Sequence, residues 1–336
     1  MEPASSRSWS PSRPWSIVVD LVVALGVLLA LLVCRADPLS LGSDPWIYQH
    51  MAEDPLGYLP LAPFGYRVLT PLLVSVLPLP VPMGFTLVSW AGLAGAALVV
   101  RRTATALSSP ARGLAAMVLL LGSGLCLQVI RVPYVTDPLT LALGAGALEL
   151  GRRRRWVAVA VLLTIGAANR ETALFLLLPL AAWAVAGHGW SWRSGRIVAA
   201  LAAGPALVTA VLRWTPLLYG ETVPARVQTP GQVLAFNADH AGGAGGYLLL
   251  AAVSATGVLV PVLIANRTRI RGYLAASLLF VVPNALAVLG ATDWPRVLGP
   301  SILVLAPAAA VVVPRRPLSA LLVANPLVCA AALALT

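Results

Sequence analysis

The chain has 336 residues, of which 59% are hydrophobic and only 10% charged, and its mean hydropathy is +0.87. Soluble domains carry about 25% charged residues, so these values exclude an ordinary soluble fold. The net charge of +11 would suggest nucleic-acid binding in a soluble protein, but membrane topology explains it better here. The three cysteines are far apart and have neither metal-ligand nor disulfide-framework spacing.

Apolar runs long enough to cross a bilayer recur along the chain. They predict an all-α, polytopic transmembrane helical bundle of about 10–11 spans, and a single integral-membrane domain over residues 1–336. Three successive runs, 138–150, 156–168 and 172–186, fall well short of the ~20 residues that a span needs, so we expect their ends to lie below the surface in a water-filled cavity. The full set of runs is 17–34, 84–100, 113–130, 138–150, 156–168, 172–186, 197–213, 247–265, 272–290, 299–313 and 318–335.

The basic side chains, all of them arginine, indicate the orientation. Residues 1–16 are predicted to be a cytoplasmic tail, and the run after them is too long for the core of a signal peptide, so it is an uncleaved first span. If the spans alternate from there, 16 of the 23 arginines fall on the cytoplasmic side, among them the run 152–155. Nine of the twelve acids fall on the outer side, and because acids contribute little to orientation, this segregation needs its own cause.

Two long segments are predicted on the outer side. The first, 35–83, ends in an apolar stretch with four prolines, 66–83, which is typical of an interfacial or re-entrant helix. The second, 214–246, ends in the glycine-rich sequence HAGGAGGY, which predicts a mobile loop.

The first outer segment holds the first two groups of polar residues. Asp37 is followed by the stretch GSDPWIYQHMAED, in which Asp44 precedes a proline and helical spacing places Tyr48 on the same side. Helix capping alone would also explain Asp44. The later stretch FGYRVLTP contains Tyr66 and Arg67, where the alternative is an arginine that snorkels to the lipid interface.

Two further groups follow in the middle of the chain. RVPYVTDP contains Arg131 and Asp137, where helix capping would also explain Asp137 and a structural pair of Arg131 with Asp137 is a further alternative. AANRETALF contains Asn169, Arg170 and Glu171 between two short apolar runs. A charge at the centre of a membrane helix costs ~2.5–3.5 kcal/mol, and a plain tight turn would use Gly, Asn or Pro instead. We therefore predict that this group has a functional role.

The last group, TDWPRVLGP, contains Asp293 and Arg296, and its alternative is an interfacial tryptophan beside a loop salt bridge. All five groups fall at outer helix ends in the predicted layout. Together they predict one cavity with carboxylates for acid–base work and guanidiniums for a phosphate.

At SDPWIYQHMAED, TDPLTLAL and NRETALFLLLPL the sequence resembles the GT-C superfamily of integral-membrane glycosyltransferases, which use polyprenyl-phosphate sugars. The resemblance implies that a carboxylate of the first outer loop, here Asp44 with Asp37 as second choice, acts on the acceptor hydroxyl or holds a metal. It also implies that arginines of other outer loops bind the lipid phosphate. The first outer loop has no Asp-Asp or Asp-Glu pair, and the sequence predicts no set of metal ligands. Only the resemblance therefore suggests a divalent cation as a cofactor.

The predicted function is transfer of a sugar from a polyprenyl-phosphate donor to a glycan, lipid or protein acceptor, at an outward-facing site in a bacterial plasma membrane. A transporter or lipid flippase, and a non-catalytic protein of envelope assembly, are the alternatives. Asp44 and Asp37 are the predicted catalytic residues. The predicted substrate-binding residues are Tyr66, Arg67, Arg131, Asp137, Asn169, Arg170, Glu171, Asp293 and Arg296.

Overall fold

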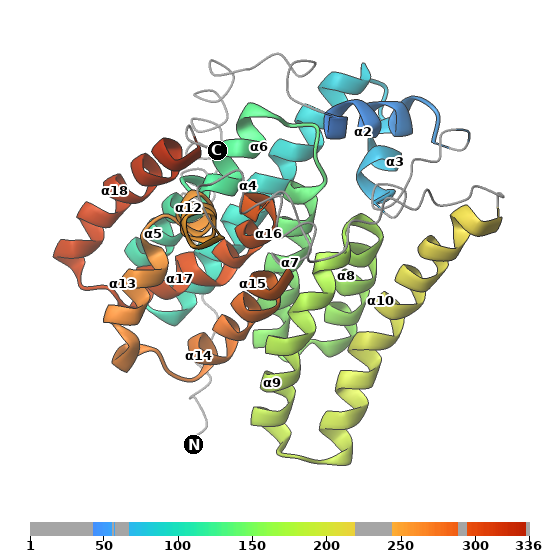
Figure 1. Ribbon diagram of the computed structural model, residues 1–336. Helices are drawn as coiled ribbons and strands as arrows, with labels where there is room; N and C mark the ends of the chain where they lie inside the picture. Colours follow the sequence, from blue (N-terminus) through green and yellow to red (C-terminus); the bar gives the residue numbers. More distant parts are fainter. Residues whose placement is uncertain (1–42, 56, 58–66, 219–243, 288–293, 334–336) are drawn as a thin grey trace. The chain divides into compact units, whose positions relative to one another are not determined.

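The computed structural model describes residues 43–55, 57, 67–218, 244–287 and 294–333. Every regular element in these ranges is a helix (Figure 1). Each apolar run that falls within them is helical, so the predicted all-α class is confirmed. The tail 1–16, the run 17–34 and most of the segment 214–246 lie outside the described residues.

The helices follow one another closely along the chain. The first part contains α2 (Ser43–Glu53), α3 (Leu69–Ser75), α4 (Val81–Leu107), α5 (Pro110–Leu121), α6 (Gly124–Arg131), α7 (Asp137–Arg152) and α8 (Trp156–Asn169). Next come η3 (Glu171–Leu176), α9 (Leu177–His188) and α10 (Trp192–Leu218). The last part contains α12 (Ala244–Thr256), α13 (Leu259–Ala265), η4 (Arg267–Arg269), α14 (Tyr273–Ser277), η5 (Leu278–Phe280), α15 (Val281–Ala287), α16 (Trp294–Leu298), η7 (Gly299–Ser301), α17 (Ile302–Val312) and α18 (Arg315–Leu333).

Among the described helices, four are long and apolar enough to cross a membrane by themselves, namely α4, the continuous η3–α9 pair, α10 and α18. The α5–α6 pair becomes a fifth if its 54° bend is counted within one span. The other apolar helices are shorter. Of the three runs predicted to be short, η3–α9 reaches 18 residues, whereas α7 and α8 have only 16 and 14. At 1.5 Å per residue these two helices are about 24 and 21 Å long, less than the ~30 Å hydrocarbon core.

Helix α7 lies at the centre of the helices that form the site. It packs against α4, α8 and α17, and α8, α9 and α10 lie side by side next to it (Figure 1). Gly92 lets the backbone of α4 approach the first turn of α7, because a Cβ there would lie 2.6 Å from the carbonyl carbon of Pro138. Further along α7, Gly144 faces Leu176 of η3 and Leu303 of α17.

The two ends of α7 carry different charges. Asp137 begins the helix, whereas near its last turn the buried Glu149 accepts hydrogen bonds from Arg152 at 2.7 Å, from Arg153 at 2.6 Å and from Thr103 of α4 at 2.9 Å. The ion cluster at this end is therefore satisfied within α4 and α7.

Buried polar groups stabilise breaks in the helices. Gly257, with a φ of 60°, separates α12 from α13. The freed backbone N–H of Val258 donates to Oδ1 of the buried Asn325 of α18 at 2.9 Å. Broken helices at membrane depth require such partners, because lipid offers none.

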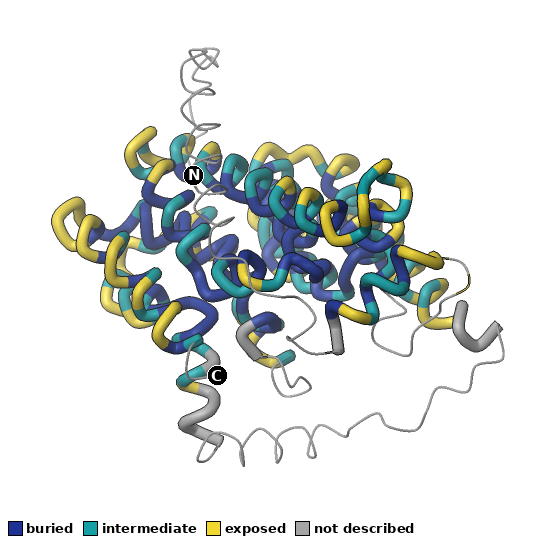
Figure 2. Tube along the Cα trace, turned by 90° about the horizontal axis from the view of Figure 1, so that it is seen from above, coloured by how far each residue is buried: buried dark blue, intermediate teal, exposed yellow. Residues whose placement is uncertain are grey.

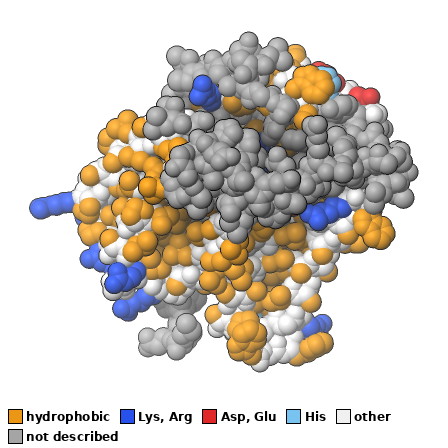
Figure 3. Space-filling model, viewed as in Figure 1, with side chains coloured by type: hydrophobic (Ala, Val, Ile, Leu, Met, Phe, Trp, Pro, Cys, Tyr) orange, Lys and Arg blue, Asp and Glu red, His pale blue; other side chains and the backbone are white. Residues whose placement is uncertain are grey.

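The outer surface of the helices is largely apolar. Figure 2 shows the buried residues concentrated in the interior of the helix packing, and Figure 3 shows hydrophobic side chains covering most of the visible described surface. Large side chains such as Val157, Leu207 and Trp214 are more than half exposed. An apolar exterior of this kind suits contact with lipid chains.

The α4–α7 contact gives a testable prediction. Gly92→Ala should destabilise the protein by about 1–3 kcal/mol, because the added methyl group meets backbone atoms that have no rotamer to change. Thermal unfolding in detergent measures the effect. Gly95→Ala is the matched control on the same helix, since its Cβ would lie 3.6 Å from Ala142 in ordinary contact. Equal melting temperatures for the two variants would contradict the close approach.

Candidate functional site

Asn169 joins α3, α7 and α8 by hydrogen bonds near the Asp137 end of α7. It is completely buried at the last residue of α8. Its Oδ1 accepts from the backbone N–H and the hydroxyl of Thr70 at 3.1 and 2.6 Å. Its Nδ2 donates to the carbonyl of Thr136 at 2.7 Å and to the hydroxyl of Thr140 at 2.8 Å. The amide thus makes all four bonds that it can make, so it positions the site rather than offering a free group to a substrate.

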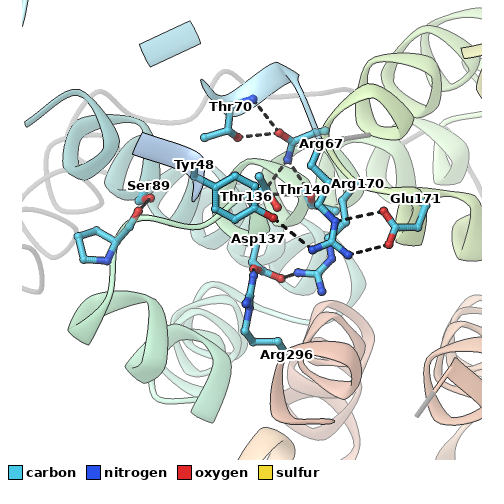
Figure 4. Close-up of polar contacts among 12 residues, drawn as sticks. Tyr48, Arg67, Thr70, Ser89, Thr136, Asp137, Thr140, Arg170, Glu171 and Arg296 are labelled. Carbon is cyan, nitrogen blue, oxygen red and sulfur yellow. Dashed lines mark hydrogen bonds and ion pairs between the residues drawn. The ribbon is translucent and has the colours of Figure 1, made fainter. Parts of the chain in front are cut away.

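Asp137 binds two arginines from distant parts of the chain. Its side chain is 1% exposed. Arg296 of α16 donates to Oδ2 through Nε at 3.1 Å and Nη2 at 2.9 Å, and Arg170 pairs with Oδ1 through Nη1. Figure 4 shows both guanidiniums converging on this carboxylate. One carboxylate therefore fixes the positions of two buried cations.

A second ion pair joins the first outer segment to η3. Arg67 donates to Glu171 through Nη2 at 2.8 Å and Nε at 3.3 Å, and through Nη1 to the hydroxyl of the fully buried Tyr48 at 3.2 Å. Burial alone would lower the pKa of Arg67, but the interactions with Tyr48 and Glu171 outweigh it and raise the pKa above its ordinary value. Arg67 therefore stays charged.

Helix α2 is held against this ion pair by apolar packing. Tyr48 and Met51 of α2 form one buried cluster with Val74, Phe85 and Tyr134. Asp44 lies in the first turn of α2, four residues or about 6 Å along the axis before Tyr48. The helix therefore places Asp44 one turn before Tyr48, the residue whose hydroxyl accepts from Arg67.

Charge is unbalanced in this cluster. Among the described residues, three arginines face two carboxylates, and Arg170 is only 4% exposed (Figure 4). The Nε of Arg170 has no hydrogen-bond partner within the described ranges. The unused Nε of this nearly buried guanidinium is therefore available to donate to an anion.

The structure thus gathers six of the predicted binding residues, Arg67, Asp137, Asn169, Arg170, Glu171 and Arg296. Arg131 is different: it is exposed at the end of α6, and the suggested pairing with Asp137 is wrong, because Arg170 and Arg296 occupy both oxygens of that carboxylate. Asp37, Tyr66 and Asp293 lie outside the described residues, as does the side chain of Asp44.

Sequence reasoning did not include three threonines in the site, Thr70, Thr136 and Thr140, and it named Tyr48 only as a neighbour of Asp44. Thr136 and Thr140 flank Asp137 with a helical spacing of four, which was the available signal. For a divalent cation the described part offers a poor fit. Asp137 and Glu171 are paired with guanidiniums, and no group of three metal-ligating side chains occurs in the described ranges.

Asp137 and Glu171 differ in burial, and this difference predicts that they contribute differently to the free energy of unfolding. Asp137→Asn should lower the free energy of unfolding by roughly 3–5 kcal/mol, because it leaves two buried guanidiniums without a counter-charge. Glu171→Gln should cost clearly less, since 31% of its side chain is exposed and water replaces part of the interaction. Thermal unfolding compares them, and a reversed order would contradict the central position of Asp137.

Two crystal structures of ArnT from Cupriavidus metallidurans have a similar fold. The apo form matches with a TM-score of 0.60 and 16% identity over 89% of this chain and 59% of that chain. The form bound to undecaprenyl phosphate matches with a TM-score of 0.56 and 15% identity over 90% of this chain and 61% of that chain. This chain therefore spans about three-fifths of the ArnT chain.

No protein-family model and no curated protein matches the sequence. At 15–16% identity the likeness to ArnT concerns the fold. Because ArnT is a GT-C glycosyltransferase, the predicted resemblance is confirmed at that level, and the chain is a multi-pass membrane protein with a GT-C-like helical fold.

Proposed function

We propose that this protein is a membrane glycosyltransferase that moves a sugar from a polyprenyl-phosphate donor to a cell-envelope acceptor. One observation carries the proposal: three buried arginines face two carboxylates at one end of α7, in a fold like that of ArnT. One of the similar ArnT structures is bound to undecaprenyl phosphate, which is a polyprenyl phosphate.

The arginines are the proposed phosphate-binding groups. Guanidiniums bind phosphate oxygens in bidentate fashion, and they do so most strongly where water is excluded. Arg170 has an unbonded Nε and is nearly buried, so it is the first candidate, with Arg67 and Arg296 beside it. Asp137 and Glu171 orient these arginines. Tyr66 and Asp293 are proposed to contribute from positions next to Arg67 and Arg296 in sequence, and Arg131 from the end of α6.

Asp44 is the proposed catalytic base, with Asp37 as the second candidate. In the proposed step the acceptor oxygen forms a bond to the anomeric carbon of the sugar, and the bond from that carbon to the phosphate oxygen breaks. The proton of the acceptor hydroxyl passes to the carboxylate. Negative charge remains on the departing lipid phosphate, where preorganised arginines stabilise it. No step uses a metal ion.

The proposed site faces outward in a bacterial plasma membrane. The positive-inside rule supports this orientation, because Arg152 and Arg153 lie at the end of α7 opposite to Asp137. A short central helix keeps the arginines below the level of the headgroups, where a phosphate on a prenyl chain arrives.

The direct test is transfer of a radiolabelled sugar from a polyprenyl phosphate by the purified protein. Asp44→Asn should lower the rate constant roughly 10²–10⁴-fold, as expected for loss of a general base, with binding of the lipid phosphate retained. Arg170→Gln should instead weaken binding of polyprenyl phosphate by about tenfold or more, since a hydrogen bond to a charged group is lost.

Arg193→Gln, an exposed arginine of α10, is the matched control and should leave both quantities unchanged. Thermal unfolding verifies that each variant is folded. A full transfer rate in Asp44→Asn would remove that residue from the mechanism. Absence of transfer by the unaltered protein together with solute uptake into proteoliposomes would favour a transporter. Envelope function that survives both Asp44→Asn and Arg170→Gln would favour a non-catalytic protein.

A further inference from the structure

Three buried polar side chains outside the predicted set have unused hydrogen-bonding atoms. Thr172, Asn284 and Ser301 are each at most 5% exposed. Within the described ranges no partner is found for Oγ1 of Thr172, Oδ1 of Asn284 or Oγ of Ser301. The amide nitrogen of Asn284 donates to the carbonyl of Phe280 at 2.6 Å, which fixes the orientation of the amide and leaves its oxygen as the unused atom.

The fold brings these three residues next to the arginine cluster. Thr172 follows Arg170 by two residues on η3, and Ser301 follows Arg296 by five residues, which is roughly 8–10 Å along a helical path. Arg170 and Arg296 meet at Asp137. Helix α15, which carries Asn284, packs against both η3 and η7. Helix α15 therefore connects the elements that carry Thr172 and Ser301, which follow Arg170 and Arg296 in the chain.

Unused polar atoms at such burial are unfavourable unless a ligand satisfies them. Burial removes water as a hydrogen-bond partner, so each of these unused atoms is unfavourable until a ligand satisfies it. Other buried side chains of the described part also have unused atoms, among them Tyr134 and Thr136. Thr172, Asn284 and Ser301 differ from these because their elements are joined through α15, and because η3 and η7 follow Arg170 and Arg296 in the chain.

The chemistry of the three groups selects the ligand. The amide oxygen of Asn284 only accepts hydrogen bonds, so it has no attraction for a fully ionised phosphate oxygen, which also only accepts. It requires a ligand that donates. The hydroxyls of Thr172 and Ser301 both donate and accept. A sugar hydroxyl matches all three groups, whereas a phosphate matches the guanidiniums.

We propose that Thr172, Asn284 and Ser301 form a hydroxyl-binding subsite that holds the sugar of the donor, adjacent to the arginines that hold its phosphate. This inference rests on the proposed function for the identity of its ligand. It assigns sugar selectivity to α15, η3 and η7, and affinity for the lipid carrier to the arginines.

The test compares binding of undecaprenyl phosphate with binding of undecaprenyl-phosphate hexoses and pentoses to the full chain. The unaltered protein should bind at least one of the sugar-bearing lipids more tightly than the bare phosphate. Asn284→Leu should reduce that preference about tenfold and leave the affinity for undecaprenyl phosphate unchanged, with thermal unfolding verifying that the variant is folded.

Ser301→Ala and Thr172→Val are near-isosteric second variants and should each reduce the same preference. Ser277→Ala is the matched control, because its buried hydroxyl already donates to the carbonyl of Tyr273 at 2.7 Å. It should change neither affinity.

The outcomes separate this subsite from the transferase proposal. Sugar transfer by the unaltered protein, with sugar preference intact in all three variants, would overturn the subsite and leave the proposed function standing. Equal loss of affinity for the bare and the sugar-bearing lipid would also overturn it, since the residues would then act only through the arginines. A sugar preference that Asn284→Leu abolishes, in a protein that transfers nothing, would support the subsite while the transferase proposal fails.

Discussion

The arrangement of the site depends on one buried carboxylate. Asp137 holds Arg170 and Arg296 together, and so joins the start of α7 to the α8–η3 junction and to α16. Separation of these elements would leave guanidiniums in an apolar medium without a counter-charge, at a cost of several kcal/mol. Gly92 contributes from the other side, because it lets α4 pack directly on the turn that contains Asp137 and Pro138.

The polar residues around Asp137 divide into two groups by their hydrogen bonds. Asn169 uses all the hydrogen bonds of its amide, and so it fixes α3, α7 and α8 relative to one another. A fully bonded group of this kind supports a site without binding anything itself. Arg170, Thr172, Asn284 and Ser301 retain unused atoms within the described ranges, and these are the groups that we propose for recognition.

Helix length links the fold to a lipid-borne substrate. Helices α7 and α8 have 16 and 14 residues, so they are shorter than the ~30 Å hydrocarbon core, and their polar ends lie below the headgroup level if the opposite ends reach the interface. Carboxylates and guanidiniums at such a depth must pair with one another or with a ligand. The pairs formed by Asp137 and Glu171 satisfy part of this requirement, and the unused Nε of Arg170 is suited to a phosphate oxygen.

The sequence by itself determined the helical membrane class, the helical positions of the described apolar runs and the stretches that carry ionised groups, because hydropathy and charge act through neighbours along the chain. Only the tertiary structure decided the pairings. Sequence proximity suggested Arg131 as a partner of Asp137, whereas the actual partners include Arg296, 159 positions away. Asn284 and Ser301 lie within apolar runs, where sequence gave no reason to single them out. Their importance arises from which helices contact one another, and packing between distant segments decides that.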